Sequence, residues 1–276
     1  MSATTPSNAS AVCDLVGAAV APADALKAVS LEWVDWQVSP GDYWVLAAWA
    51  GSGKGDLLAT LAGLQRPVAG RCLVLGRDLY RLDQGGLLEL RRHVGFVFGD
   101  GGRLFHDLTL AENVALPVSY HTNRSLGEVG PEIEELLTAT ELTGIADRLP
   151  AQVDRQWQER TALARALAMK PELLLLANPI AGFDGRHVLW WREFLAQLND
   201  GHAWFGNRPL TLILATEDLR PWGGHAKQFA VIRDRRLITF RAKAELAACD
   251  EGFLREWQNG TAYDRPSSAT MKQDPA

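Results

Sequence analysis

The sequence predicts an α/β fold in which helices pack against a mostly parallel sheet. Short apolar segments that suit strands alternate with helical segments along most of the chain, and this order is typical of parallel sheets. One of these strands runs directly into a glycine-rich turn and then a helix. Hydrophobic residues make up 47% of the 276 residues, so a sizeable core can form.

The first elements are expected to be strands. Val12–Val20 and Leu31–Val38 are alternately or continuously apolar, as strands are. Pro40-Gly41-Asp42 has the composition of a turn, and the apolar run Tyr43–Ala48 after it predicts a buried strand. Leu57–Leu64, which follows the glycine-rich turn, is expected to be a helix.

A helical insertion is expected between about residues 100 and 158. It follows a second buried strand at Val94–Phe98, and Pro131–Thr143 carries helical periodicity with acidic residues on one side. The later elements are a helix at Arg160–Met169, buried strands at Leu173–Leu176 and Thr211–Ala215, and a hairpin of Phe229–Ile232 and Leu237–Phe240 around Asp234 and Arg235.

One domain is expected over residues 11–260, with a helical subdomain at about residues 100–158. Residues 1–10 and 261–276 are small or polar and are expected to be disordered. The net charge of −5 and the pI of about 5.7 argue against a nucleic-acid partner, because such partners usually meet a basic face.

The cysteine content favours a reducing, cytosolic compartment. The three cysteines, Cys13, Cys72 and Cys249, are odd in number and widely spaced, which disfavours a disulfide framework or a metal site. No signal peptide is expected, because no lysine or arginine precedes Lys27. No apolar run approaches the ~20 residues that span a bilayer, so any membrane role is expected to depend on a partner subunit.

The glycine-rich turn has the sequence context of a phosphate-binding loop. It follows a buried strand and opens a helix, so its backbone N–H groups and the helix N-terminus can cradle phosphate. Lys54 is expected to reach the outer phosphates, while Gly51 and Gly53 allow close approach of the backbone. The candidate nucleotide-binding residues are Ala48, Trp49, Ala50, Gly51, Ser52, Gly53, Lys54, Gly55 and Asp56.

Two departures from the phosphate-loop pattern change its chemistry. Ala48 stands where the first glycine is expected, and Gly55 replaces the Ser or Thr whose hydroxyl holds Mg²⁺. Asp56 adds a carboxylate near the phosphates, and two unit charges ~4 Å apart repel by about 4 kcal/mol at an effective dielectric near 20. The alternative is a plain glycine-rich turn, in which Asp56 interacts favourably with the helix dipole.

Three stretches of the chain resemble ABC ATPases. They are PGDYWVLAAWAGSGKGDLLATLAGLQRPVAG, RRHVGFVFGDGGRLFHDLTLAENVALPV and RTALARALAMKPELLLLANPIAGFD, and their order and spacing agree with that family. The resemblance implies a RecA-like P-loop NTPase core, an antiparallel β layer and an inserted helical subdomain. The sequence LFHDLTLAENVALP is most similar to that of ATPases of phospholipid and solvent-tolerance (Mla-type) transport.

The resemblance also shows which functional positions have changed. It places the Q-loop glutamine at Gly99, the Walker B aspartate at Ala177, the catalytic glutamate at Asn178 and the switch histidine at Glu217. The adenine-stacking aromatic is missing between Val20 and Leu31, and Trp33 is a distant substitute. The D-loop keeps Asp184, and the signature falls at Val153, Asp154, Arg155, Gln156 and Trp157.

These changes are expected to impair hydrolysis. P-loop enzymes hold Mg²⁺ with the Ser/Thr hydroxyl and the Walker B carboxylate, and Gly55 and Ala177 offer neither. Asn178 can orient a water but cannot accept its proton. Glu217 as a replacement base is the alternative, although it would repel the terminal phosphate. ATP is therefore expected to bind weakly, and Mg²⁺ to contribute little.

The signature carries a second expectation. In the family, its glycines let a helix N-terminus touch the partner subunit's ATP, and here Arg155 and Gln156 are expected to block that approach. Asp154 is expected to cap the helix that follows.

The resemblance implies a membrane permease and either a homodimer or a second ABC subunit as partners, with the chain on the cytoplasmic face of the inner membrane. A degenerate transporter subunit is the first hypothesis, with lipid as the implied substrate class. The alternatives are an ATPase with an atypical metal arrangement and a soluble scaffold that has left transport.

Overall fold

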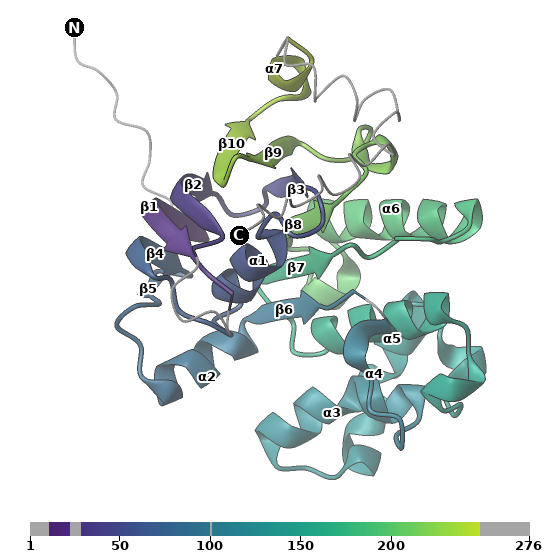
Figure 1. Ribbon diagram of the computed structural model, residues 1–276. Coiled ribbons are helices and arrows are strands. Elements are labelled where there is room, and N and C mark those ends of the chain that lie inside the picture. Colours follow the sequence, from purple (N-terminus) through teal and green to yellow (C-terminus); the bar gives the residue numbers. More distant parts are fainter. Residues whose placement is uncertain (1–10, 23–28, 100, 249–276) are drawn as a thin grey trace, which may run out of the picture.

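The computed structural model describes residues 11–22, 29–99 and 101–248, and these form two sheets and the helices around them (Figure 1). The smaller sheet is antiparallel. Its strand order is β2 (Leu31–Val38), β1 (Cys13–Val20), β4 (Ala69–Val74) and β5 (Arg77–Asp78). The expectations for residues 1–10, 261–276 and Cys249 lie outside the described residues.

The larger sheet confirms the predicted α/β fold. Its neighbouring strands are parallel except for the edge pair β9–β10. Its order is β10 (Arg236–Phe240), β9 (Gln228–Arg233), β3 (Tyr43–Ala47), β8 (Thr211–Thr216), β7 (Leu173–Ala177) and β6 (Val94–Val97). The predicted hairpin is β9–β10, and Asp234 and Arg235 both have the positive φ that a tight two-residue turn requires.

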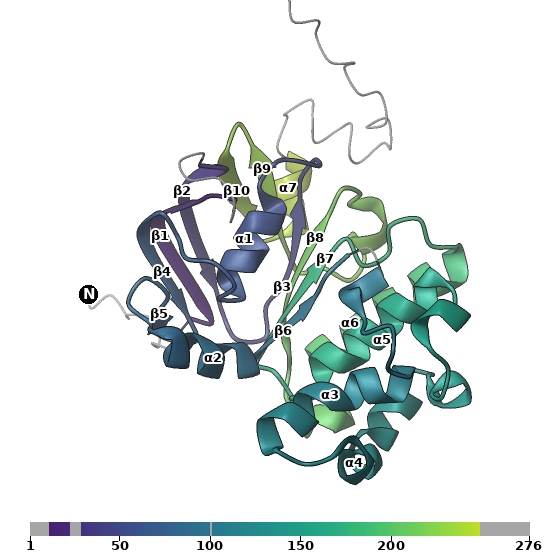
Figure 2. The ribbon, with the colours of Figure 1, turned by 60° about the horizontal axis from the view of Figure 1, so that its bottom comes forward.

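Helix α1 (Lys54–Leu61) lies between the two sheets (Figure 2). Its buried leucines pack in one core cluster with Trp44 and Leu46 of β3 and with residues of the antiparallel sheet. The alternate β3 residues, Tyr43, Val45 and Ala47, belong to a second cluster with α5 (Arg155–Leu167) and α6 (Gly185–Asp200). Strand β3 is therefore buried on both faces, as its unbroken apolar sequence predicts.

The helical part of the molecule groups α3 (Leu110–Thr122), α4 (Leu126–Ala139) and α5 on one side of the large sheet (Figures 1 and 2). Two further helices complete the described structure, α2 (Gln84–Arg92) and α7 (Lys243–Ala248). The boundaries proposed for a separate helical subdomain remain a prediction.

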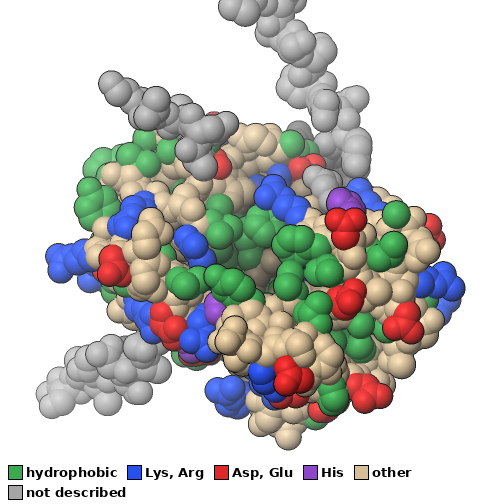
Figure 3. Space-filling view, turned by 90° about the horizontal axis from the view of Figure 1, so that it is seen from below, with side chains coloured by type: hydrophobic (Ala, Val, Ile, Leu, Met, Phe, Trp, Pro, Cys, Tyr) green, Lys and Arg blue, Asp and Glu red, His purple; other side chains and the backbone are tan. Residues whose placement is uncertain are grey.

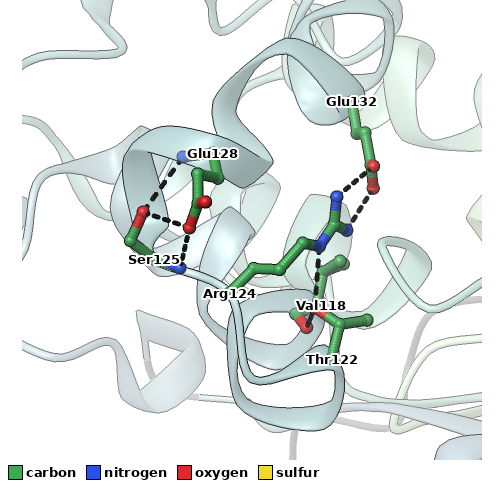
Figure 4. Close-up of polar contacts among 6 residues, drawn as sticks. All are labelled: Val118, Thr122, Arg124, Ser125, Glu128 and Glu132. Carbon is green, nitrogen blue, oxygen red and sulfur yellow. Dashed lines mark hydrogen bonds and ion pairs between the residues drawn. The ribbon is translucent and has the colours of Figure 1, made fainter.

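Helix α4 begins at Leu126, earlier than the predicted start near Pro131. Ser125 caps it, because the backbone N–H of Glu128 donates to the Ser125 hydroxyl while the Glu128 carboxylate accepts from the Ser125 backbone (Figure 4). Arg124 also forms a bidentate ion pair with Glu132, in which Arg124 Nη2 lies 2.8 Å from Glu132 Oε2 (Figure 4). This local cap outweighs the preference of proline for the first turn.

A cavity of about 310 Å³ lies where the parallel strands begin, at the opposite end of the sheet from α1. Pro40, His93, Pro171 and Leu210, each near the start of a strand, contribute to its lining. Seen from below, the surface has a central hollow with hydrophobic side chains around it (Figure 3).

Candidate functional site

The glycine-rich turn joins β3 to the N-terminus of α1, as the sequence predicts. Gly51 and Gly53 have φ of 76° and 89°, and a Cβ atom at Gly53 would lie 2.9 Å from the Cβ of Ser30. Both glycines are therefore needed for the turn. The backbone amides of Gly53, Lys54 and Gly55 make no hydrogen bond within the described part of the chain, so they are available to an anion.

Two further loop residues, Ser52 and Asp56, bear on phosphate binding. The Ser52 hydroxyl oxygen is buried and has no hydrogen-bond partner among the described residues. Asp56 lies in the first turn of α1, where a carboxylate interacts favourably with the helix dipole. Ala48 is buried, whereas Trp49, Ala50, Gly51 and Gly55 are exposed.

The Lys54 ammonium is paired inside the protein. Its Nζ lies 2.8 Å from Oε1 of Glu217 and donates to the carbonyl oxygen of Trp49 at 3.2 Å. The Lys54 side chain is 13% exposed, while that of Glu217 is 45% exposed. The lysine expected to reach the outer phosphates thus already holds a carboxylate, and the sequence did not predict this contact.

Asn178 donates to the same Glu217 oxygen through Nδ2 at 3.4 Å. It follows β7 with a φ of 48°, a left-handed conformation that asparagine tolerates better than most residues. Strands β3, β8 and β7 are neighbours in the sheet, so Lys54, Glu217 and Asn178 all follow carboxyl ends at one edge. This edge is where open α/β sheets bind ligands.

Gly99 lies directly against the end of β7. A Cβ atom built on Gly99 would come within 2.9 Å of the Ala177 carbonyl oxygen, which is closer than such atoms normally approach. The position has no space for a side chain in this backbone arrangement. The structure therefore places Gly99 against Ala177, while Asn178 and Lys54 both contact Glu217.

The oxygen donors suited to Mg²⁺ are missing from the two expected positions, since Gly55 has no side chain and Ala177 has a methyl group. Among the described residues, no group of three or more His, Cys, Asp or Glu side chains is arranged to hold a metal ion.

The residues that the resemblance assigns to the signature lie at the start of α5. Asp154 was expected to cap α5, and it does occupy the N-cap position. Its side chain, however, makes no capping hydrogen bond. Arg155 Nε lies 3.9 Å from the buried carboxylate of Glu159. Gln156 Nε2 donates to Asp184 Oδ2 at 3.3 Å, which joins the signature to the D-loop of the same chain.

Asp184 caps α6. Its Oδ1 accepts from the backbone amides of Arg186 and His187, both at 3.0 Å. The hydrogen bond from the His187 amide lowers the pKa of Asp184. Asp184 therefore has a structural role as a helix cap within its own chain.

An arginine sandwich next to the signature was not predicted from the sequence. The Arg160 guanidinium lies 3.6 Å from the ring centre of Trp190 and 4.6 Å from that of Trp157, and its Nη1 donates to Glu141 at 2.6 Å. His187 packs edge-on against Trp157 at 5.3 Å. These contacts link α5 to α6 and give two of the ten tryptophans a packing role.

Asn113 is the other residue that the sequence did not single out. It is fully buried on α3, and its side chain makes four hydrogen bonds to the backbone of residues 105–109. This network fixes a loop on which Phe105 is 56% exposed. Trp33, the distant candidate for adenine stacking, lies on β2 and is 72% exposed.

The family model described as "ABC transporter" matches residues 31–181. The sulfate/thiosulfate import ATP-binding protein CysA of Mycobacterium bovis is 34% identical over 79% of this chain, and the chain spans 60% of that relative. The methionine import ATP-binding protein MetN of Cupriavidus metallidurans is 34% identical over 63% of this chain and 49% of its own length. The probable ribonucleotide transport ATP-binding protein mkl of Mycobacterium bovis is 26% identical over 87% of this chain and 66% of its own length.

Two solved structures show the same fold. The dimeric post-hydrolysis structure of the ATP-binding cassette MJ0796, bound to ADP and Pi, superposes with a TM-score of 0.73 at 24% identity over 83% of this chain and 98% of that one. CbiO1 from Clostridium perfringens superposes with a TM-score of 0.73 at 21% identity, over 86% of this chain and 91% of that one. No helix among the described residues has the length and apolar character needed to cross a membrane.

Proposed function

The chain belongs to the ABC transporter family, and we propose that it is the nucleotide-binding subunit of a membrane transporter with little or no ATP hydrolysis of its own. The observation that carries this proposal is the pairing of Lys54 with Glu217 at 2.8 Å in a loop that lacks metal ligands. The fold and the phosphate loop support nucleotide binding, whereas the occupied lysine argues against catalysis.

The family implies that ATP binds together with Mg²⁺. The residues present suit the phosphate groups of ATP but not the metal ion. The loop amides at the N-terminus of α1, which have no hydrogen-bond partner among the described residues, suit phosphate oxygens. Gly55 and Ala177 do not suit Mg²⁺, because neither supplies an oxygen from its side chain. Hydrolysis depends on neutralising the charge that develops on the transferred phosphate, and that charge would here meet Glu217 instead of a metal.

The partners are proposed from the family and from the surface. We propose a membrane permease and either a second copy of this chain or a second ABC subunit, with the chain peripheral on the cytoplasmic face of the inner membrane. The exposed loop at Phe105, held by Asn113, supports a docking role for this region. Lipid as the transported class rests only on the sequence of residues 104–117, whereas the names of the relatives refer to sulfate, methionine and ribonucleotides.

A phosphate-release assay on the purified chain tests the catalytic part of this proposal. Wild type is expected to match Lys54→Ala at background level. The triple repair Gly55→Ser, Ala177→Asp and Asn178→Glu is expected to stay inactive as a homodimer, because Arg155 and Gln156 still occupy the signature. Mixed with an intact ABC subunit, the repaired chain is expected to gain activity at one composite site.

Wild-type turnover near ~1 per second, abolished by Lys54→Ala, would contradict the catalytic part. Co-purification tests the transport part: a tagged chain is expected to bring a membrane subunit out of detergent extract. A chain recovered alone from membranes that contain its permease would favour the scaffold alternative.

A further inference from the structure

We propose that Glu217 makes the phosphate loop selective for metal-free nucleoside diphosphates over nucleoside triphosphates. This inference rests on the proposed nucleotide binding and names the ligand class of the same site. In this arrangement the Glu217 carboxylate takes the position on Lys54 that a terminal phosphate would need.

The first step is the geometry of the carboxylate. Glu217 Oε1 is 2.8 Å from Lys54 Nζ and 3.4 Å from Asn178 Nδ2, so two donors from different loops converge on one oxygen. Lys54 is largely buried, and it also donates to the Trp49 carbonyl oxygen. These two bonds leave one ammonium N–H, so a terminal phosphate oxygen that reaches Lys54 lies beside the Glu217 carboxylate and shares the ammonium with it.

The second step is the rigidity of the segment that carries Glu217. Thr216, the last residue of β8, donates from its hydroxyl to the Asp218 carbonyl at 3.0 Å and accepts from the Asp218 amide at 3.1 Å. Asp218 in turn pairs with Arg220 through several hydrogen bonds. Glu217 therefore lies between two anchored residues, and moving its carboxylate away from Lys54 would disturb these contacts or require a change of its rotamer.

The third step is the charge balance. Lys54 and Glu217 together are neutral, and Asp56 adds a negative charge at the same end of α1. A diphosphate can place its last phosphate on the loop amides and leave the ion pair intact. A triphosphate adds charge next to Glu217, and Gly55 and Ala177 hold no metal ligand to screen it. Like charges at such short range repel in a partly desolvated site.

Calorimetric titration of ADP and ATP in the presence of EDTA tests the inference on the full chain. Wild type is expected to bind ADP at least about tenfold more tightly than ATP, a difference of about 1.4 kcal/mol. Glu217→Gln keeps the shape and removes the charge, and it is expected to tighten ATP binding so that the ratio falls below about threefold. Glu217→His is a second variant, in case the amide still holds Lys54.

The matched control is Glu135→Gln, which makes the same charge change on the exposed face of α4 and is expected to leave the ratio as in wild type. Thermal melts show that each variant is folded. Nucleotide binding with an unchanged ratio in both Glu217 variants would overturn the selectivity and leave the proposed function intact. No binding of either nucleotide by wild type or by either Glu217 variant would overturn the proposed nucleotide binding itself.

Discussion

Replacement of Asn113 by alanine is expected to destabilise the protein through the loop at residues 105–109. The Asn113 Oδ1 accepts from the Phe105 amide at 2.8 Å, and Nδ2 donates to the carbonyls of Phe105, Leu108 and Thr109 at 3.0, 3.1 and 3.0 Å. All four bonds are lost in Asn113→Ala, and the fully buried side chain leaves a small void.

The magnitude follows from the partners that are left behind. The Thr109 carbonyl keeps the bond from the Asn113 amide, and the Phe105 carbonyl keeps one from the Leu108 amide. The Phe105 amide and the Leu108 carbonyl are left without a partner among the described residues, and at roughly 1–3 kcal/mol for each such group the cost is about 2–6 kcal/mol. Phe105 and His106 are exposed, so water reaches part of this loop and the lower half of the range of about 2–6 kcal/mol applies, as an order of magnitude of about 2–4 kcal/mol. We expect a loss of about 2–4 kcal/mol, which at roughly 2–4 °C per kcal/mol for a chain of this size lowers the melting temperature by about 4–16 °C.

Urea and thermal unfolding measure this loss. Asn113→Asp separates hydrogen bonding from packing, because it keeps the volume but turns a carboxylate oxygen toward three carbonyl oxygens. It is expected to destabilise at least as much as Asn113→Ala. His106→Ala, an exposed change in the same loop, is the control and is expected to leave stability unchanged. A melting temperature of Asn113→Ala within about 2 °C of wild type would refute this reasoning.

Three further predictions concern the residues around the candidate site. Burial, followed by the Arg160 charge, lowers the pKa of His187 below 6.5. The unfolded chain therefore binds that proton first, so melting temperatures of wild type should fall more steeply between pH 7 and 5 than those of His187→Gln. Arg160→Lys keeps the charge but loses the planar stacking, and urea unfolding should show a loss of about 1–2 kcal/mol. Gly99→Ala and Asn178→Glu should each cost about 1–3 kcal/mol in the same assay, the first from the clash with Ala177 and the second from the left-handed backbone.

The strands of the large sheet could be predicted from the sequence because they are continuous apolar runs. The β9–β10 hairpin could also be predicted, since Asp234 and Arg235 interrupt two apolar segments. The sequence does not predict strand β4, because its first three residues are exposed and Gly70, at φ 75°, breaks the alternation. Helix α6 was not predicted either, although Asp184 is a recognisable N-cap and the buried face of the helix repeats at helical spacing.

The candidate site was predictable as a set of positions but not as a set of contacts. The order of motifs along the chain places Lys54, Gly99, Asn178 and Glu217 at one sheet edge, because all follow strands of the same sheet. The ion pair between Lys54 and Glu217 joins residues 163 positions apart. Its formation depends on the adjacency of β3 and β8 and on side-chain rotamers, which no local pattern encodes.

The residues that the resemblance assigns to the catalytic positions contact one another, which argues that they act as one arrangement. Gly99 can approach the Ala177 carbonyl because it has no Cβ atom, and Asn178 suits the left-handed turn that follows. Asn178 and Lys54 both donate to Glu217, so the residues that the resemblance assigns to the catalytic-glutamate and switch-histidine positions contact each other. Restoring Glu at position 178 alone would set two carboxylates against each other beside Lys54 and leave the metal ligands missing. Groups that act as a unit are strongly non-additive, so the expected response to single repairs is lost stability without gained turnover.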